Sequence, residues 1–545
     1  RRSRDFGKHR PTFQTGLPTM SSEAVAESKA HTPSEKPEGE EGKGPDLGQY
    51  TSTKSLSKVG TKHGGPARVV HPDSFVMDDH FYPRVAGATI HPIVLSFFQM
   101  STERIVKRYC HMNPRVDAAA LTRLLAYKPK CFLWAGADLF HVTNINGNRQ
   151  MVVVETNSCP SGQKSMPLLD EAQEMGGYKF LLENAFARLL RKEGPPECKE
   201  GALAVLYDKN YMEASGYAAA MAELTKEPVY LVEFYAGDTD ASARWVDGVL
   251  QVRTEEGEWK PVRAAFRYVT QRPWTRIPLS SKTLVLNPTL ACLAGGRNKL
   301  VASKAYDLFN AELLAKGTGV RIRTPETRQD VSKAEVPLYV NMFGGKAVVK
   351  VPTSNAGQGV YTICTKEELD HFMAQDFPYD KFIVQSLIGN RNWSSVTPTG
   401  QLYHVGTIPN KRNDSYVCDL RMMLSATDHG LRPVAVYARR ARDPLADEIT
   451  SGSDSWGMLG TNLSVKTGSM SWDTETGRLL IMSTKDFNRL GLGVDELIDG
   501  YVQTVLSVIA IDKMCTRLIR PDGSFNMELF RSLHEDDTLV REIMH

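Results

Sequence analysis

A lysine inside a short apolar strand, followed by a glycine-bearing turn, is the most informative chemical pattern in this sequence. Residues 346–362 read KAVVKVPTSNAGQGVYT, in which a β-branched run contains Lys350. Burial of an unpaired ammonium group is costly, so this lysine makes sense if its strand lines a cleft that receives a phosphate. Gly357 and Gly359 would let the backbone N–H groups of the turn approach that phosphate. The alternative is a plain hairpin with a solvated lysine and flexible turn glycines.

A second group combines two carboxylates and an amide in a predicted hairpin. Residues 135–162 read AGADLFHVTNINGNRQMVVVETNSCPSG, which predicts two strands joined by a polar Asn/Gly turn. Side chains alternate along a strand, so Glu155 and Asn157 share one face, and Asp138 on the partner strand can face them. Two carboxylates and an amide oxygen suit a Mg²⁺ ion that bridges nucleotide phosphates. Alternatively, Glu155 and Asn157 only end a strand and begin a turn, where Asn is favoured.

Two further stretches could complete a nucleotide site. The apolar run 382–388, FIVQSLI, offers a slot and backbone polar groups to an adenine ring. Two strands predicted further along the chain carry Arg421, Arg439 and Arg440. Arginines on strands fit a clamp for phosphates or a carboxylate better than they fit a core. The alternative is a single solvated sheet face.

Length and composition limit the possible classes of protein. The chain has 545 residues, and its 66 basic and 63 acidic side chains give a formal charge of +3. This near balance does not favour nucleic acid as a partner. The eight cysteines form no C-x-x-C pair or tight cluster, which fits reduced thiols in a cytoplasmic protein, and no apolar run approaches the roughly 20 residues that span a bilayer. Residue 1 is Arg, and Met20 is a candidate native start.

The chain divides into a tail and three predicted regions. Residues 1–66 are rich in Ser, Lys, Glu, Gly and Pro and poor in large apolar side chains, which predicts a disordered N-terminal tail. Residues 67–195 contain the predicted metal-binding hairpin and end in a predicted helix over 168–193. Residues 196–290 predict an α/β region that begins with a strand–helix–strand unit. Residues 291–545 carry the nucleotide-binding lysines, the arginines and C-terminal helices.

The order of these segments resembles that of ATP-grasp ligases, the superfamily that includes glutathione synthetase and D-alanine–D-alanine ligase. The most specific match is the Glu-x-Asn of VVVETNSCPSG, and LNPTLACLAGGRNKLVASK is similar to the piece that carries the first ATP lysine. In the usual order the metal-binding residues follow the nucleotide lysines. Here they precede Lys299, Lys304 and Lys350, which resembles the circularly permuted branch with a glutathionylspermidine-synthase-like arrangement. The resemblance implies an α/β (α+β) chain with a permuted ATP-grasp fold.

The resemblance implies ATP and Mg²⁺ as cofactors and a role for each group of residues. Lys350 and either Lys299 or Lys304 would hold ATP phosphates. The turn that would close over the phosphates contains Ser354, Gly357, Gln358 and Gly359. The adenine hinge would be Gln385, Ser386, Leu387 and Ile388. The catalytic arginines would be Arg421, Arg439 and Arg440, with Arg421 stabilising the transferring phosphoryl group.

The metal site has two candidate locations. Asp138, Glu155 and Asn157 would ligate Mg²⁺ in the permuted order. Near the C-terminus, STKDFNRLGLG offers a second carboxylate-x-Asn pair, Asp486 and Asn488. The predicted strand before that pair has no acidic residue equivalent to Asp138, which favours the upstream set.

The implied reaction is the formation of an amide bond from a small-molecule carboxylate and an amine. Phosphorylation by ATP gives the carboxylate a good leaving group, and attack by the amine on the acyl-phosphate releases phosphate beside ADP. Metal ions and basic residues stabilise the charge that develops on the transferred phosphoryl group. Two alternatives stay open, an ATP-grasp kinase that stops at a phosphorylated product and a catalytically inactive scaffold. No motif identifies the substrates or the oligomeric state, and neither nucleic acid nor a membrane is an expected partner.

Overall fold

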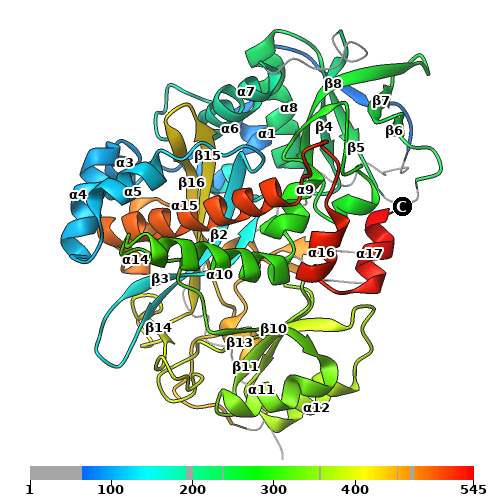
Figure 1. Ribbon diagram of the computed structural model, residues 1–545. Coiled ribbons are helices and arrows are strands. Elements are labelled where there is room, and N and C mark those ends of the chain that lie inside the picture. The colour runs from blue at the N-terminus through cyan, green and yellow to red at the C-terminus, as the bar shows by residue number, and fades with distance from the viewer. Residues whose placement is uncertain are drawn as a thin grey trace, which may run out of the picture. The chain divides into compact units, whose positions relative to one another are not determined.

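The computed structural model describes residues 64–191, 200–235, 238–354, 357–450, 452–466 and 472–544. Residues 62–545 form one compact unit, in which the described residues build three larger sheets and one two-stranded sheet (Figure 1). The predicted α/β fold class is confirmed. The predicted disordered tail lies almost wholly outside the described residues.

The first sheet is built mostly from residues 202–286 and is parallel at its centre. Its strand order is β1 (Arg68–Val70), β5 (Val229–Glu233), β4 (Ala202–Tyr207), β8 (Trp259–Tyr268), β7 (Val249–Arg253) and β6 (Ala243–Val246), with β9 (Leu284–Leu286) on β8. The helix α8 (Tyr211–Thr225) connects β4 to β5, so the predicted strand–helix–strand unit is confirmed. Strand β4 pairs in parallel with β8, and Tyr207 lies opposite Tyr268. The carboxyl ends of both strands therefore share one edge, where parallel sheets bind ligands.

The second sheet brings together segments from both halves of the chain. Its strands are β14 (Tyr403–His404), β2 (Trp134–Thr143), β15 (Cys418–Thr427), β16 (Gly430–Arg440) and β19 (Leu479–Leu480), with β3 (Gln150–Asn157) also on β2. Strands β2 and β3 form the predicted hairpin, in which Asp138 lies opposite Glu155 and Gly136 opposite Asn157. Directly opposed residues project from the same face of a sheet. The hairpin thus presents both carboxylates and the amide on one side.

The third sheet carries the lysine hairpin. Its strand order is β10 (Thr327–Ser332), β13 (Lys381–Ser386), β11 (Ala347–Lys350) and β12 (Val360–Ile363). Lys350 lies opposite Val360, which confirms the hairpin predicted around this lysine. A separate pair consists of β17 (Ser464–Lys466) and β18 (Trp472–Thr474).

One long helix packs along the second sheet and anchors the core. Helix α15 (Val494–Arg517) contacts β3, β2 and β15 and lies beside α10 (Lys299–Ala315) (Figure 1). Its buried residues include eight Val, Leu and Ile side chains, which remove a large apolar area from water. The other helices are α1 (Met77–His80), α2 (Pro83–Ala86), α3 (Pro92–Phe98), α4 (Thr102–Met112), α5 (Ala118–Leu125), α6 (Gly176–Leu181), α7 (Ala187–Leu190), α9 (Thr289–Ala291), α11 (Val336–Met342), α12 (Lys366–Ala374), α13 (Ser455–Leu459), α14 (Thr484–Leu490), α16 (Met527–Leu533) and α17 (Asp537–Met544).

Two predicted elements have different boundaries in the structure. The helix predicted over 168–193 begins only at Gly176, because the Asp170 carboxylate accepts the backbone N–H of Ala172 and closes a turn. The strand predicted to run through residue 388 ends at Ser386. It ends there because the N–H of Leu387 donates to the Ser395 hydroxyl instead of to a neighbouring strand.

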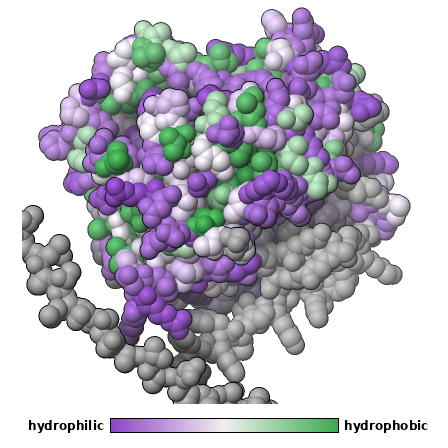
Figure 2. All heavy atoms as spheres, turned by 90° about the horizontal axis from the view of Figure 1, so that it is seen from below, coloured by the Kyte–Doolittle hydropathy of each residue, from purple (hydrophilic) through white to green (hydrophobic). Residues whose placement is uncertain are grey.

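The hydropathy of the surface residues changes over short distances. On the face shown in Figure 2, hydrophilic and hydrophobic residues are interspersed. Several large apolar side chains are exposed, among them Ile145, Leu314 and Leu338, as is common on protein surfaces. Among the residues that the structure describes, no helix combines the length and the apolar character needed to cross a lipid bilayer.

Candidate active site

Two adjoining cavities lie where the second sheet meets its neighbours. The first cavity, of about 150 Å³, lies between the second and third sheets. The second cavity, of about 140 Å³, lies between the second sheet and the carboxyl edge of the first sheet. Five residues line both cavities, namely Glu155, Asn157, Arg421, Arg439 and Asn462. Four of these five were singled out from the sequence.

The first cavity is lined by both apolar and charged side chains. The apolar lining residues include Phe140, Val348, Val360, Ile388, Trp456 and Leu459. The charged lining residues include Asp138, Glu155, Lys350, Asp419, Arg421 and Arg439. A cavity that combines apolar walls with cations suits a flat ring that is joined to phosphates.

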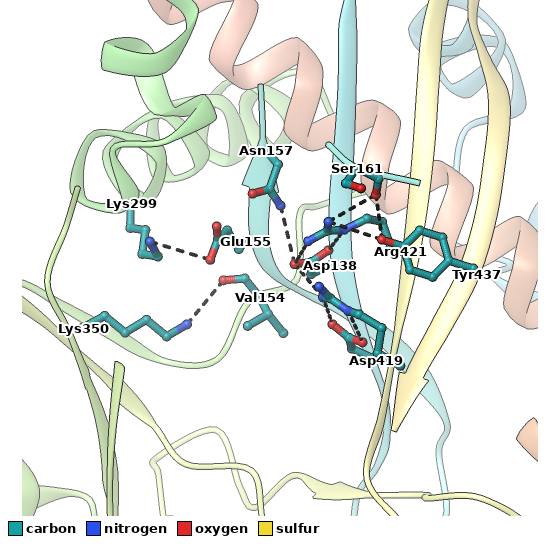
Figure 3. A network of polar contacts seen from close by, with 11 residues as sticks. Asp138, Val154, Glu155, Asn157, Ser161, Lys299, Lys350, Asp419, Arg421 and Tyr437 are labelled. Atoms are coloured by element: carbon teal, nitrogen blue, oxygen red, sulfur yellow. Dashed lines mark hydrogen bonds and ion pairs between the residues drawn. The ribbon is translucent and has the colours of Figure 1, made fainter. Parts of the chain in front are cut away.

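Two buried lysines, Lys350 in the lining of the first cavity and Lys299 beside Glu155, are only partly satisfied (Figure 3). The Lys350 Nζ donates to the Val154 backbone oxygen at 3.5 Å, and no carboxylate of the described residues lies within ion-pair distance of it. The Lys299 Nζ donates to the Ser354 backbone oxygen and lies 3.7 Å from Glu155 Oε2. Burial lowers the pKa of both lysines, that of Lys350 to about 8. An anionic ligand would supply the charge that these ammonium groups lack.

The arginines, in contrast, are held by carboxylates. Arg421 binds Asp138 with two hydrogen bonds, Nε to Oδ1 at 2.6 Å and Nη2 to Oδ2 at 2.7 Å (Figure 3). Arg439 lies 2.9 Å from Asp138 Oδ2 and binds Asp419 through its Nε and Nη2. Strand register explains both pairs, because Arg421 lies opposite Asp138 and Arg439 lies opposite Asp419. Burial alone would raise the pKa of Asp138, but Arg421 and then Arg439 lower it.

The predicted metal ligands come together, but they differ in how open they are. Both oxygens of Asp138 already bind arginine, whereas Glu155 and Asn157 face the two cavities. The Asn157 Nδ2 lies 3.5 Å from Asp138 Oδ2, so its amide oxygen can point elsewhere. Among the described residues no group of three or more His, Cys, Asp or Glu side chains is placed to hold a metal ion. The oxygens of Glu155 and Asn157 fit Mg²⁺ if a bound ligand supplies further oxygens.

The glycine turn borders the first cavity. Gly357 lines the cavity with φ +75°, and Gly359 has φ +65°. A Cβ atom at residue 359 would lie 2.9 Å from Val351 Cβ, so only glycine fits there without a shift. Ser354 contributes its backbone oxygen to Lys299, and Gln358 is exposed. Residues 355–356 of the turn lie outside the described residues.

Three residues of the predicted adenine hinge line the first cavity, and one does not. Gln385, Ser386 and Ile388 are in its wall. Leu387 points away from it and is buried, and both its backbone groups bind Ser395, with the N–H on Oγ at 2.7 Å and the carbonyl accepting the Ser395 N–H at 2.9 Å. Its backbone N–H and C=O are therefore already used.

Lys304 and Arg440 lie away from both cavities, whereas Lys299 is in neither lining but contacts Glu155, which lines both. The Lys304 Nζ binds Asp330 Oδ2 and the Leu533 backbone oxygen, each at 2.6 Å. Of the two lysines on helix α10, the structure thus places Lys299 in the site. Arg440 follows Arg439 on β16 and so projects from the opposite sheet face, where its guanidinium stacks 4.7 Å from the Tyr416 ring.

The C-terminal carboxylate-x-Asn pair is also outside the cavities. Asp486 is fully buried in helix α14, where it binds Arg84 and accepts the N–H of Ile481. Asn488 is exposed, because residues two apart on a helix project in different directions. The pair does not converge on one point.

The second cavity contains functional candidates that the sequence did not single out. Its lining includes Lys164, Lys209, Arg267, Arg297 and Tyr437. Lys209 and another lining residue, Thr270, are each the second residue after a strand, β4 and β8, beyond the carboxyl ends of these parallel strands. This position beyond the ends of parallel strands could have identified both residues from the sequence, because ligands of parallel sheets bind at this edge. Asp419 likewise could have been found from its spacing of two residues from Arg421 on one strand.

Comparisons with known proteins give partial structural likenesses. No model of a protein family matches the sequence, and no curated protein sequence matches it. A RimK domain ATP-grasp protein from Sphaerobacter thermophilus is 15% identical with a TM-score of 0.26, over 45% of this chain and 92% of that one. A glutathione synthetase-like effector from Globodera pallida is 9% identical with a TM-score of 0.32, over 65% and 86%.

A third solved structure matches this chain over a similar share of its length. D-alanyl-alanine synthetase A from Vibrio cholerae is 13% identical with a TM-score of 0.28, over 43% of this chain and 88% of that one. All three likenesses have TM-scores below 0.5. The functional interpretation therefore rests on the residues that line the two cavities.

Proposed function

We propose that this chain is an ATP-grasp enzyme that uses ATP to join a carboxylate to an amine. The observation that carries the proposal is the meeting of the two cavities at Glu155, Asn157, Arg421 and Arg439. The first cavity would receive ATP, with the adenine ring against its apolar wall and the phosphates toward Lys299 and Lys350. The second cavity would receive the carboxylate. The shared residues would then surround the phosphoryl group during its transfer.

The order of the segments supports a circular permutation of the fold. The hairpin with Glu155 and Asn157 comes before Lys299 and Lys350 in the chain, yet Glu155 lies 3.7 Å from Lys299. Residues 67–195 would then supply the metal-binding hairpin and residues 291–545 the nucleotide lysines. Residues 196–290 would form a separate α/β region that closes the second cavity.

Different residues of the site would have different roles in phosphoryl transfer. Lys299 and Lys350 would neutralise the ATP phosphates, and burial strengthens that attraction because the local dielectric is low. Glu155 and Asn157 would hold Mg²⁺, which supplies charge neutralisation on the phosphates. Among the described residues, the Arg421 Nη1 makes two long contacts, 3.4 Å each, to the Ser161 oxygen and the Tyr437 hydroxyl. It is therefore the nitrogen of Arg421 that is most available to the transferring group.

The reaction proceeds in two steps whose atoms balance. A carboxylate oxygen attacks the γ-phosphorus, the bond from that phosphorus to the β-bridging oxygen breaks, and ADP leaves. The amine nitrogen then attacks the carbonyl carbon of the acyl-phosphate, loses a proton, and expels inorganic phosphate. Arginine and lysine donors that are fixed before the reaction stabilise the charge on the phosphoryl oxygens at little cost in reorganisation.

The test is ADP release from Mg·ATP with pools of small carboxylates and amines, followed by mass spectrometry of the product. We expect Glu155→Gln to lower the rate at least about 100-fold. Glu183→Gln, at an exposed i,i+4 ion pair with Lys179, is the matched control and should be unchanged.

Three results would contradict the proposal in different ways. A phosphorylated product without an amide would indicate a kinase. Binding of the non-hydrolysable analogue AMP-PNP without turnover in any pool would indicate a scaffold. Failure of AMP-PNP to bind at all would remove the nucleotide site itself.

A further inference from the structure

The second cavity is lined by more cationic side chains than its lining carboxylates can neutralise. Its lining contains six cationic side chains, namely Lys164, Lys209, Arg267, Arg297, Arg421 and Arg439. Glu155 is the one carboxylate among its described lining residues, and it lies toward Lys299 at the junction with the first cavity. Each cation can be sorted by the partner that it has.

Three of the six cations are satisfied within the protein. Arg421 and Arg439 bind Asp138 and Asp419. Arg267 is buried and donates from its three nitrogens to the Asn287 oxygen at 2.7 Å, the Val269 oxygen at 3.0 Å and Ser158 Oγ at 3.1 Å. These arginines build the walls of the cavity.

The other three cations, like Arg267, have no carboxylate within ion-pair distance among the described residues, and they make fewer hydrogen bonds than Arg267. Lys164 makes weak contacts with Asn210 Oδ1 at 3.4 Å and with Tyr82, whose ring lies 5.2 Å from its Nζ. Against the effect of burial, which lowers the pKa of Lys164, Tyr82 and Glu213 raise it. Arg297 donates only to the backbone oxygens of Thr353 and Thr270 and stacks on a tryptophan ring. Lys209 is half-buried and makes no hydrogen bond or ion pair with the described residues. Burial lowers its pKa to about 8, although Asp208 opposes this shift.

The nearby carboxylates are already saturated by other groups. Asp208 accepts the N–H groups of Thr270 and Gln271, the Thr270 hydroxyl and an Nη2 hydrogen bond from Arg276. Glu213 accepts two backbone N–H groups and two hydroxyls, from Ser161 Oγ at 2.6 Å and Tyr268 at 3.0 Å. Neither carboxylate has oxygen capacity left for the three cations.

We propose that the carboxylate substrate carries a second anionic group, a carboxylate or a phosphate, which Lys209, Arg297 and Lys164 bind in the second cavity. This inference rests on the proposed function, because the first carboxylate of the substrate is the one that ATP activates. The shared residues Glu155, Asn157 and Arg421 mark the end of the cavity where activation takes place. The three unpaired cations are the part of the cavity left for the second anion. A substrate with one negative charge would leave them unsatisfied, at a cost in binding free energy.

The test measures the thermal stability of the full chain with three probes at constant ionic strength. The probes are tricarballylate, glycerol 3-phosphate and propionate, each at up to 10 mM or so, against sodium chloride. We expect tricarballylate or glycerol 3-phosphate to raise the Tm by a few degrees and propionate to have no effect, because binding to the native state stabilises it. Which of the two polyanions acts distinguishes a second carboxylate from a phosphate.

Variants connect the response to the named cations. Lys209→Met should weaken the apparent affinity for the active polyanion at least about 10-fold, and Lys209→Arg should restore most of it. Lys366→Met, which removes an exposed lysine, is the matched control and should respond like the wild type. Arg297→Gln serves as a second variant if Lys209→Met does not fold.

The outcomes separate this inference from the proposed function. The inference is overturned if no polyanion acts beyond sodium chloride, if propionate acts as strongly, or if both Lys209→Met and Arg297→Gln keep the full response. AMP-PNP binding, measured on the same samples, tests the first cavity alone. Retained AMP-PNP binding with no polyanion response would leave the ATP site standing and reject the dianionic substrate.

Discussion

Two groups of buried or half-buried charge lie within one site and are built in opposite ways. In the arginine cluster, Arg421 and Arg439 share the carboxylates of Asp138 and Asp419 through short bidentate contacts. By contrast, Lys350 and Lys209 are lysines without a carboxylate partner among the described residues, and burial lowers the pKa of each to about 8. Paired charges hold the fold together, whereas unpaired ones reduce its stability and bind a ligand more tightly in return.

The largest expected effect is a difference in the free energy of unfolding between variants of two adjacent arginines on β16, Arg439 and Arg440. Arg439→Met would leave Asp419 buried without its cation, so we expect a loss of about 3–5 kcal/mol in the free energy of unfolding. Arg440→Met removes a half-buried arginine that stacks on Tyr416, for which about 0.5–1 kcal/mol is expected. Urea denaturation of both variants gives the comparison. Equal losses would show that the arginine cluster does not carry the stability assigned to it.

The next effect concerns a lysine of the other group. Lys350→Met removes a buried cation and keeps the apolar stem, so the free energy of unfolding should stay equal or rise. Its affinity for AMP-PNP should nevertheless fall about 10- to 100-fold, as for the loss of a charge-assisted hydrogen bond. Calorimetric titration and urea denaturation on the same sample measure both quantities. A destabilised Lys350→Met protein with unchanged AMP-PNP affinity would place Lys350 with the structural charges instead.

The smallest effect is the pH dependence that Lys209 contributes. Its folded pKa of about 8 lies below the ordinary value of 10.5, because burial disfavours the charged form more than Asp208 favours it, while Arg297, Arg421 and Lys164 add repulsion. Between pH 8 and 10.5 the unfolded chain holds a proton that the native lysine has released. Raising the pH through this window therefore increases native stability.

This contribution is measured as a difference between two proteins. The free energy of unfolding of the wild type should gain about 2 kcal/mol more than that of Lys209→Met between pH 7.5 and 9.5. Lys350 and the tyrosines titrate in both proteins, so their effects cancel. Parallel pH profiles would mean that Lys209 is solvated and does not belong among the unpaired charges.

The local sequence pattern predicted the two hairpins, but it did not predict the contacts between distant segments that complete the site. The alternation of side chains placed Glu155 and Asn157 on one face and Lys350 on a cleft-lining strand, because each hairpin partner is close in the sequence. The bidentate pair of Arg421 and Asp138 depends on the register of β15 against β2. That register is set by tertiary packing, and no local pattern contains it.

Short motifs were ambiguous wherever secondary structure decided the direction of a side chain. Lys299 and Lys304 both lie on helix α10, and only the position of the helix against the Ser354 turn selects Lys299. Asp486 and Asn488 resemble ligands in the sequence, but a helix directs them apart. Lys209 and Arg297 of the second cavity are single residues in loops, which carry no periodic signal at all.

Because β2 pairs with β15, the site can form only after the ribosome has synthesised both strands. Arg421 lies 283 positions after Asp138 in the chain. At typical elongation rates the ribosome would add that stretch in tens of seconds. Until then the amino-terminal hairpin has no arginine to bind, and its carboxylates remain in water. Closure of so long a loop makes folding slow. A nascent chain that stops before residue 421 would therefore lack the centre of its second sheet and would be a natural client for a chaperone.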